Sequence, residues 1–95
     1  MNPTLSGRLT VDHVARTPAQ LGPILKSCRI ERGLTQRSAG APVGLKQSTV
    51  SQIEAHAERS SVESLYKLLS ALNLELVIRD KDKGNVSSSA KTPKW

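Results

Sequence analysis

Residues 34–54 read LTQRSAGAPVGLKQSTVSQIE, and this segment carries two helix starts, one on each side of a glycine. Thr35 is a typical helix N-cap, and Gly44 interrupts the segment between the two helices. The polar run at residues 46–49 opens a second helix, whose apolar side chains recur at helical spacing. Two short helices joined through a glycine predict a helix-turn-helix.

A longer helix is predicted before this segment. Thr17 is its expected N-cap, Pro18 suits the first helical position, and Gln20 would complete a capping box with Thr17. Pro23 lacks the N–H group of a regular helix, so we expect either a kink there or a helix that begins at Pro23. Gly33 is the expected C-cap. The buried stripe of this helix should be Leu21, Ile24, Leu25 and Cys28.

A further helix and a strand are predicted after the motif. Ser60 and Glu63 form a candidate capping box, and Asn73 can adopt the left-handed conformation that ends a helix. The apolar residues that follow alternate with others, as in a strand. A single strand cannot satisfy its own backbone groups, so it pairs either with the N-terminal arm or with its copy in a second chain. The predicted dimer-interface residues are Leu74, Leu76 and Ile78.

The sequence therefore predicts an all-α domain of about five helices, with one C-terminal strand per chain that pairs across a homodimer. We expect a flexible arm at residues 1–16, the DNA-binding and dimerisation domain at 17–80 and a disordered polar tail at 81–95. No segment has the roughly 20 apolar residues of a membrane span, and the N-terminus lacks the apolar run of a signal peptide. A cytoplasmic, nucleoid-associated protein is expected.

The basic charge is concentrated in the predicted motif. The chain has a net charge of +6, and residues 24–53 contribute five cations against one acid, whereas residues 54–78 contribute two cations against four acids. A local basic excess indicates a polyanionic partner on that side of the domain. Only 2% of the residues are aromatic, which argues against a stacking platform for single strands and favours duplex DNA.

The motif resembles the helix-turn-helix of the Cro and phage-repressor (Xre) family, over roughly residues 17–72. The matching segments are Leu34-Thr35-Gln36 and the run from Val43 to Glu54. The resemblance implies a lambda-repressor-like fold. This chain departs from the family pattern at Ala39, Gly40 and Pro42, and glycine and proline disfavour a helix interior. We therefore expect the helix over residues 37–43 to be short or distorted.

A closer resemblance is to the HipB-like antitoxins of HipA–HipB toxin–antitoxin pairs, through GLKQSTVS at residues 44–51, the leucine-rich helix, the strand, the polar tail and Trp95. It implies a repressor that binds an inverted-repeat operator of its own operon and holds a HipA-like serine/threonine kinase inactive. Trp95 is the predicted toxin-contacting residue. The alternative is a stand-alone Xre-type repressor without a toxin partner.

The first turn of a recognition helix enters the major groove, so short polar side chains are expected there. Gln47 can pair with the N6 and N7 edge of adenine, and Lys46 can donate to guanine. Gln36 begins the preceding helix, where an anion is favoured, and the family resemblance implies that Gln36 and Gln47 brace one another. The predicted base-contacting residues are Lys46, Gln47, Ser48, Thr49 and Ser51. The predicted phosphate-contacting residues are Gln36, Arg29, Arg32 and Arg37.

Catalytic and metal-binding roles have no support in the sequence. The single cysteine, Cys28, lies on an apolar helix face, which predicts a core residue. His13 and His56 lie in separate segments without a ligand-spaced partner, so no metal site and no cofactor are expected. No nucleophile and base are spaced for catalysis, and the chain is predicted not to be an enzyme.

Overall fold

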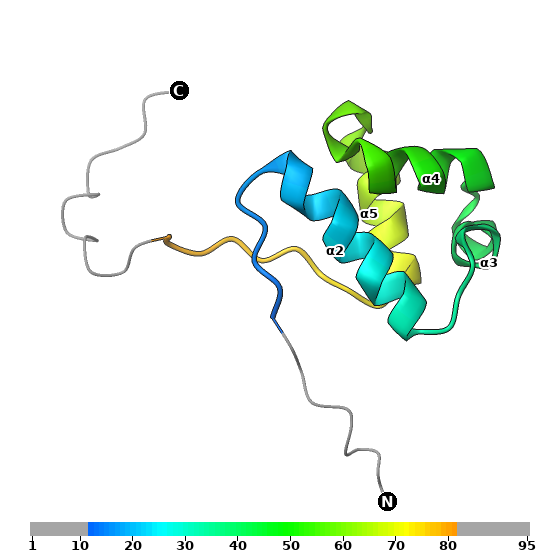
Figure 1. Cartoon of the computed structure of the whole chain (residues 1–95), viewed down its shortest axis with the longest axis horizontal. Coiled ribbons are helices and arrows are strands. Elements are labelled where there is room, and N and C mark those ends of the chain that lie inside the picture. The colour runs from blue at the N-terminus through cyan, green and yellow to red at the C-terminus, as the bar shows by residue number, and fades with distance from the viewer. Residues whose placement is uncertain (1–11, 82–95) are drawn as a thin grey trace, which may run out of the picture.

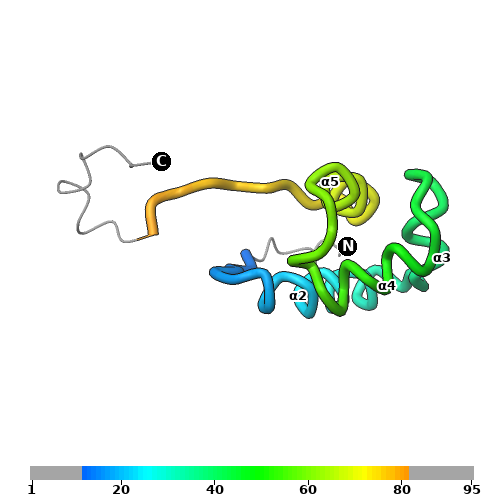
Figure 2. The backbone as a smooth tube through the Cα atoms, turned by 90° about the horizontal axis from the view of Figure 1, so that it is seen from above, coloured from blue at the N-terminus to red at the C-terminus, as the bar shows by residue number. Residues whose placement is uncertain are grey.

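The computed structural model describes residues 12–81, and within them it has four α-helices, two 3₁₀-helices and no strand. The α-helices are α2 (Pro18–Glu31), α3 (Gln36–Gly40), α4 (Gln47–Ala55) and α5 (Val62–Ala71). The 3₁₀-helices are η1 (Ala41–Val43) and η2 (Ala57–Arg59). Helices α2 and α3 pack on α4 (Figure 1), and α5 lies across the other side of the bundle (Figure 2). No helix of the described residues is long and apolar enough to cross a membrane.

Helix α2 begins at Pro18 and continues through Pro23, so the alternative of a helix beginning at Pro23 is wrong. The predicted capping box is also wrong, because the Thr17 side chain accepts no hydrogen bond. Instead the Arg16 backbone N–H donates to Gln20 Oε1 at 2.6 Å. Gly22 marks the crossing of α2 and α4, since a Cβ atom there would lie 2.2 Å from the Glu54 carbonyl oxygen. Only a residue without a side chain permits this approach.

Helix α3 is short, as the sequence predicted. The Ser38 N–H donates to Thr35 Oγ1 at 2.9 Å, and the Thr35 N–H donates to Ser38 Oγ at 2.8 Å, which completes a capping box. The helix ends at Gly40 and tightens into η1. A Cβ atom at Gly40 would lie 2.5 Å from the Leu45 carbonyl oxygen, so glycine allows the turn to pass directly over α3. Gly44 then has a φ of 74°, in the left-handed region.

Helix α5 begins one residue later than predicted. Its N-cap is Ser61, whose hydroxyl accepts from the Ser64 N–H at 3.0 Å. The Ser60 hydroxyl instead donates to the carbonyl of Ala57, the first residue of η2. Asn73 has a φ of 59° and ends the helix as expected.

The core lies between α2, α4 and α5. The prediction that Cys28 is a core residue is confirmed, because its side chain is buried. Burial of this many aliphatic side chains is the main stabilising term for a domain of this size. The buried cluster consists of Leu25, Cys28, Ala39, Leu45, Val50, Ile53, Leu68, Leu69 and Leu72.

The five-helix count and the C-terminal strand are not confirmed in the described residues. Residues 74–80 are extended, and they run past α2 and project beyond the helices (Figures 1 and 2). The Leu74 N–H donates to the Leu69 carbonyl at 2.8 Å, but within the described part no backbone hydrogen bond joins residues 75–80 to another segment. A strand needs a partner, and residues 12–81 provide none for this segment.

Candidate nucleic-acid interface

The N-terminal turn of α4 presents most of the predicted base-contacting side chains. Lys46, the N-cap, is exposed together with Gln47 and Ser48, while Thr49 and Ser51 are half-buried. The Thr49 N–H is bonded to the Lys46 carbonyl at 2.9 Å, whereas the first N–H groups of a helix have no intrahelical acceptor. The turn therefore offers hydrogen-bond donors and acceptors at the exposed start of α4.

The first residues of α3 and α4 are joined by a direct hydrogen bond. Gln47 Nε2 donates to Gln36 Oε1 at 2.7 Å, so the bracing implied by the family resemblance is present. Thr35, Gln36, Arg37 and Gln47 line a shallow polar concavity of about 360 Å³. The contact fixes the side chain at the tip of α4 relative to α3.

Arg29 lies in the interior of the domain, and not at the surface, where the predicted phosphate contact would require it. It is 8% exposed, and its Nε donates to Glu54 Oε2 at 2.6 Å. Its Nη2 donates to Glu54 Oε1 at 3.2 Å, and its Nη1 donates to the Leu34 carbonyl at 2.8 Å. The physical reason is that a buried guanidinium needs acceptors, and Glu54 of α4 and the Leu34 carbonyl of the α2–α3 loop supply them. Three of the five guanidinium N–H groups of Arg29 are thus bonded within the domain.

Glu54 is a residue that sequence reasoning did not single out. It is 7% exposed, and besides Arg29 it accepts a hydrogen bond from Gln36 Nε2 at 3.1 Å. The signal that could have found it is spacing. Glu54 follows Gln47 by seven residues, which is two helical turns and places both on one face of the predicted recognition helix.

The remaining predicted phosphate-contacting residues are at the surface. Arg37 is exposed beside the concavity at the start of α3. Arg32 is exposed as well, and its Nη1 donates to the Cys28 carbonyl at 3.0 Å. With Arg29 neutralised by Glu54, Lys26, Arg32, Arg37 and Lys46 carry the positive charge of the motif against Glu31.

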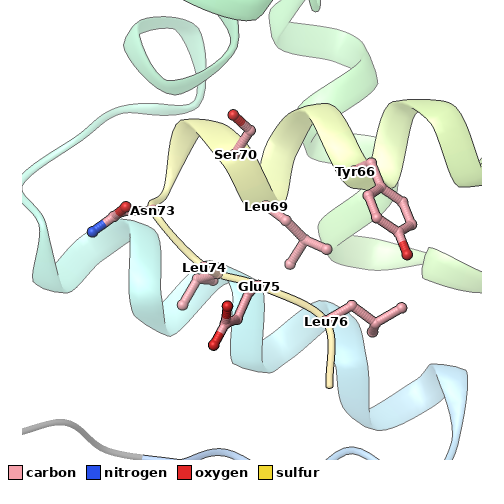
Figure 3. A pocket seen from close by; sticks show the side chains of 7 residues that line it. All are labelled: Tyr66, Leu69, Ser70, Asn73, Leu74, Glu75 and Leu76. Atoms are coloured by element: carbon pink, nitrogen blue, oxygen red, sulfur yellow. The ribbon is translucent and has the colours of Figure 1, made fainter. Parts of the chain in front are cut away.

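The predicted dimer-interface residues form a second, apolar surface. Leu74 is half-buried, Leu76 is 52% exposed, and Ile78 is 91% exposed. Figure 3 shows a concavity of about 420 Å³ between the end of α5 and the extended segment, with Tyr66 and Leu69 on one side. Exposed aliphatic side chains next to a hollow are typical of an unfilled protein contact.

Two other predictions concern residues elsewhere in the chain. Trp95 and most of the predicted N-terminal arm lie outside the described residues. Among residues 12–81 no three His, Cys, Asp or Glu side chains are grouped as metal ligands. His56 Nδ1 lies 3.5 Å from Glu58 Oε2 at the surface.

The fold and this geometry define a helix-turn-helix domain, and comparisons with known proteins agree. Residues 25–78 match the family model described as Helix-turn-helix. The chain is 31% identical over 64 residues to antitoxin HipB of Escherichia coli O6:H1, an alignment that covers 67% of this chain and 68% of the relative. It is 30% identical to antitoxin HipB of Escherichia coli K12, with 67% and 73% covered.

Solved structures of HipB have the same fold. HipB in a HipA-HipB-O2-O3 complex superposes with a TM-score of 0.71 at 27% identity, and the alignment covers 75% of this chain and 100% of that one. HipB in a complex with an O4 20mer gives the same TM-score, identity and coverage. The chain belongs to the helix-turn-helix family and, within it, to the HipB antitoxins.

Proposed function

We propose that this protein is a transcriptional repressor that reads duplex DNA with the first turn of α4. The observation that carries the proposal is the exposed Gln47 carboxamide, held at the helix tip by Gln36 at 2.7 Å. A carboxamide held in one place can pair with the N6 and N7 edge of adenine in the major groove. The proposed base-contacting set is Lys46, Gln47, Ser48, Thr49 and Ser51.

Phosphate contacts position the domain beside the groove. Arg37 and the Gln36 end of α3 lie beside Gln47 at the tip of α4, and Arg32 is exposed at the C-terminal end of α2. These residues supply the phosphate contacts in the proposal, whereas Arg29 serves the interior. Of the acidic side chains in residues 54–78, Glu54 is neutralised by Arg29, and Glu58, Glu63 and Glu75 follow the motif on η2, on α5 and in the extended segment. The positive charge of the motif is therefore left largely uncompensated on the proposed binding side.

The operator is an inverted repeat, because the repressor acts as a homodimer. Leu74, Leu76 and Ile78 of the extended segment pair with their copies in a second chain, which satisfies the backbone groups of residues 75–80 and covers the exposed aliphatic side chains. The two copies of α4 then enter successive major grooves about 34 Å apart. Solved complexes of HipB with O2-O3 and with an O4 20mer support an operator as the partner of this fold.

The second partner is a HipA-like serine/threonine kinase toxin, which the antitoxin holds inactive. Support comes from the HipA-HipB-O2-O3 complex, whose HipB chain is similar to this one over its whole length. Trp95, in the polar tail, is the proposed toxin-contacting residue, since tryptophan is enriched among interface hot spots. The protein works in the cytoplasm, at the operator of its own toxin–antitoxin operon, and needs no cofactor.

Selection of bound sequences from a random duplex pool tests the DNA-binding proposal directly. The expected result is an inverted repeat with half-sites centred one helical turn apart. A selection that enriches no sequence would contradict the proposal.

Co-purification of a kinase with the tagged protein tests the second partner. Absence of any kinase would favour a stand-alone repressor. Deleting residues 81–95 should then weaken kinase binding in calorimetry and leave operator affinity nearly unchanged.

A further inference from the structure

A buried carboxylate stands at the interior end of the hydrogen-bond chain that leads to the DNA-facing surface. Both oxygens of Glu54 accept from the Arg29 guanidinium, at 2.6 and 3.2 Å, and its Oε1 also accepts from Gln36 Nε2 at 3.1 Å. A carboxylate paired with a guanidinium can accept hydrogen bonds but cannot donate them. Glu54 therefore requires a donor from every neighbour.

This requirement is passed on through two carboxamides. Gln36 must turn its amino group toward Glu54, which leaves its Oε1 to face the tip of α4. That oxygen only accepts, so Gln47 must turn its own amino group toward Gln36, as the 2.7 Å hydrogen bond has it. The Gln47 Oε1 and one remaining N–H are then left for the DNA.

The direction of the Gln47 carboxamide decides which purine it can recognise. An oxygen acceptor beside an N–H donor matches the N6 donor and N7 acceptor of adenine. With the opposite direction, Gln47 Oε1 would face Gln36 and only donors would point outward, which matches the two acceptors O6 and N7 of guanine.

We infer that Glu54, through Gln36, fixes the Gln47 carboxamide in the orientation that selects adenine, so that a buried side chain without DNA contact is a specificity-determining positioning residue. The inference rests on the proposed function, in which Gln47 reads a base. Its physical basis is that a carboxylate only accepts hydrogen bonds. One of the two orientations of each carboxamide therefore has the lower free energy in the free protein, which is already organised for one base before it binds DNA.

The experiment uses the full chain. It replaces the Arg29–Glu54 ion pair by two uncharged side chains that do not fix the direction of the hydrogen bond to Gln36. Arg29→Met/Glu54→Gln keeps the side-chain volumes and the net charge, and the new carboxamide at position 54 can donate or accept. Binding is measured against duplexes in which each base pair of the selected half-site is changed in turn. The base pair read by Gln47 is the one where Gln47→Ala removes the preference.

At that base pair the unmodified protein should prefer adenine over guanine by about 10-fold, as expected of one bidentate contact. The double variant should lower this preference to about threefold or less, and leave the preferences at the other base pairs as they were. In a Gln47→Ala background the double change should have no further effect at that base pair. The matched control is Glu63→Gln/Lys67→Met, which removes an exposed ion pair on α5 with Nζ and Oε2 3.6 Å apart and should change no preference.

Four outcomes would overturn the inference alone: an unmodified protein that prefers guanine at that base pair, a double variant with its full preference, an equal loss at every base pair, or an effect that persists without Gln47. A protein with no sequence preference at all would overturn the proposed function as well.

A measurement on the unmodified free protein covers the case in which the double variant does not fold. Nuclear Overhauser contacts are expected between the Gln36 amino protons and the Glu54 γ-methylene. Contacts from the Gln36 amino protons to the Gln47 γ-methylene instead would show the opposite polarity and overturn the inference.

Discussion

The tip of the helix-turn-helix and the segment at residues 74–80 differ in how far a single chain satisfies their chemistry. At the tip, the polar side chains of Arg29, Gln36 and Gln47 are joined in one hydrogen-bond chain that ends on Glu54. Along the C-terminal segment, aliphatic side chains are exposed and the backbone groups of residues 75–80 have no partner within the described part.

This difference separates what is preorganised from what is completed by association. A recognition surface that is ordered before binding loses little conformational entropy when it meets DNA. A segment with exposed aliphatic side chains gains stability only when another surface covers them. One chain can therefore order the proposed recognition surface by itself. A second chain is still needed to hold two such surfaces at a fixed distance from one another.

Breaking the buried ion pair should have the largest effect. Arg29→Ala leaves Glu54 buried without its countercharge, so we expect a loss of roughly 3–5 kcal/mol in the free energy of unfolding. Urea denaturation followed by circular dichroism measures it. For so small a domain the loss would leave much of the protein unfolded. A loss below about 1 kcal/mol would mean that water reaches Glu54 and that the network is less closed than the structure describes.

The next effect concerns the open segment. Leu76→Asp places a charge on the proposed paired strand, where it must lose water against its own copy, so we expect monomers. Operator affinity should fall about 100-fold, since each monomer holds only one half-site, a loss of roughly 2.7 kcal/mol. Sedimentation velocity reports the oligomeric state, and helicity by circular dichroism should be unchanged. An intact dimer would mean that the segment pairs elsewhere.

At the tip, Gln47→Ala should weaken operator binding by roughly 1–3 kcal/mol and relax the preference at one base pair, because a bidentate contact is removed. Fluorescence anisotropy against matched and singly changed duplexes measures both quantities. An equal loss for matched and mismatched duplexes would contradict a direct base contact.

The smallest effect is expected for a phosphate contact beside the tip. Arg32→Ala should weaken binding to specific and non-specific duplexes alike and lower the salt-dependence slope by about one. Titrations at several salt concentrations provide the slope. Compared with Gln47→Ala, this variant separates residues that position the domain from residues that read bases. A change in base preference would show that Arg32 contacts a base, and would contradict its assignment as a phosphate contact.

Local patterns along the chain were sufficient for several predictions. The Thr35 cap, the glycine turn at Gly44 and the Asn73 stop were predicted correctly, because each depends on residues close in sequence. Two other local predictions failed: a helix that begins at Pro23, which was one of two alternatives there, and a cap of α5 at Ser60. A helix that packs through one face tolerates a proline near its N-terminal end, and either of two adjacent serines can serve as the cap.

The motif, its register and the face that carries the basic residues thus follow from short-range preferences and helical periodicity. Contacts between segments far apart in the chain decided the rest. Arg29 pairs with Glu54 across 25 residues and Gln36 with Glu54 across 18, so no local pattern distinguishes a buried ion pair from a phosphate ligand. Gly22 and Gly40 are likewise explained only by tertiary structure, because the backbone of another segment passes too close to each of them for a Cβ atom. Periodicity indicates which side chains point inward. The direction of the Gln47 carboxamide, however, depends on its tertiary contact with Gln36 and on the contact of Gln36 with Glu54.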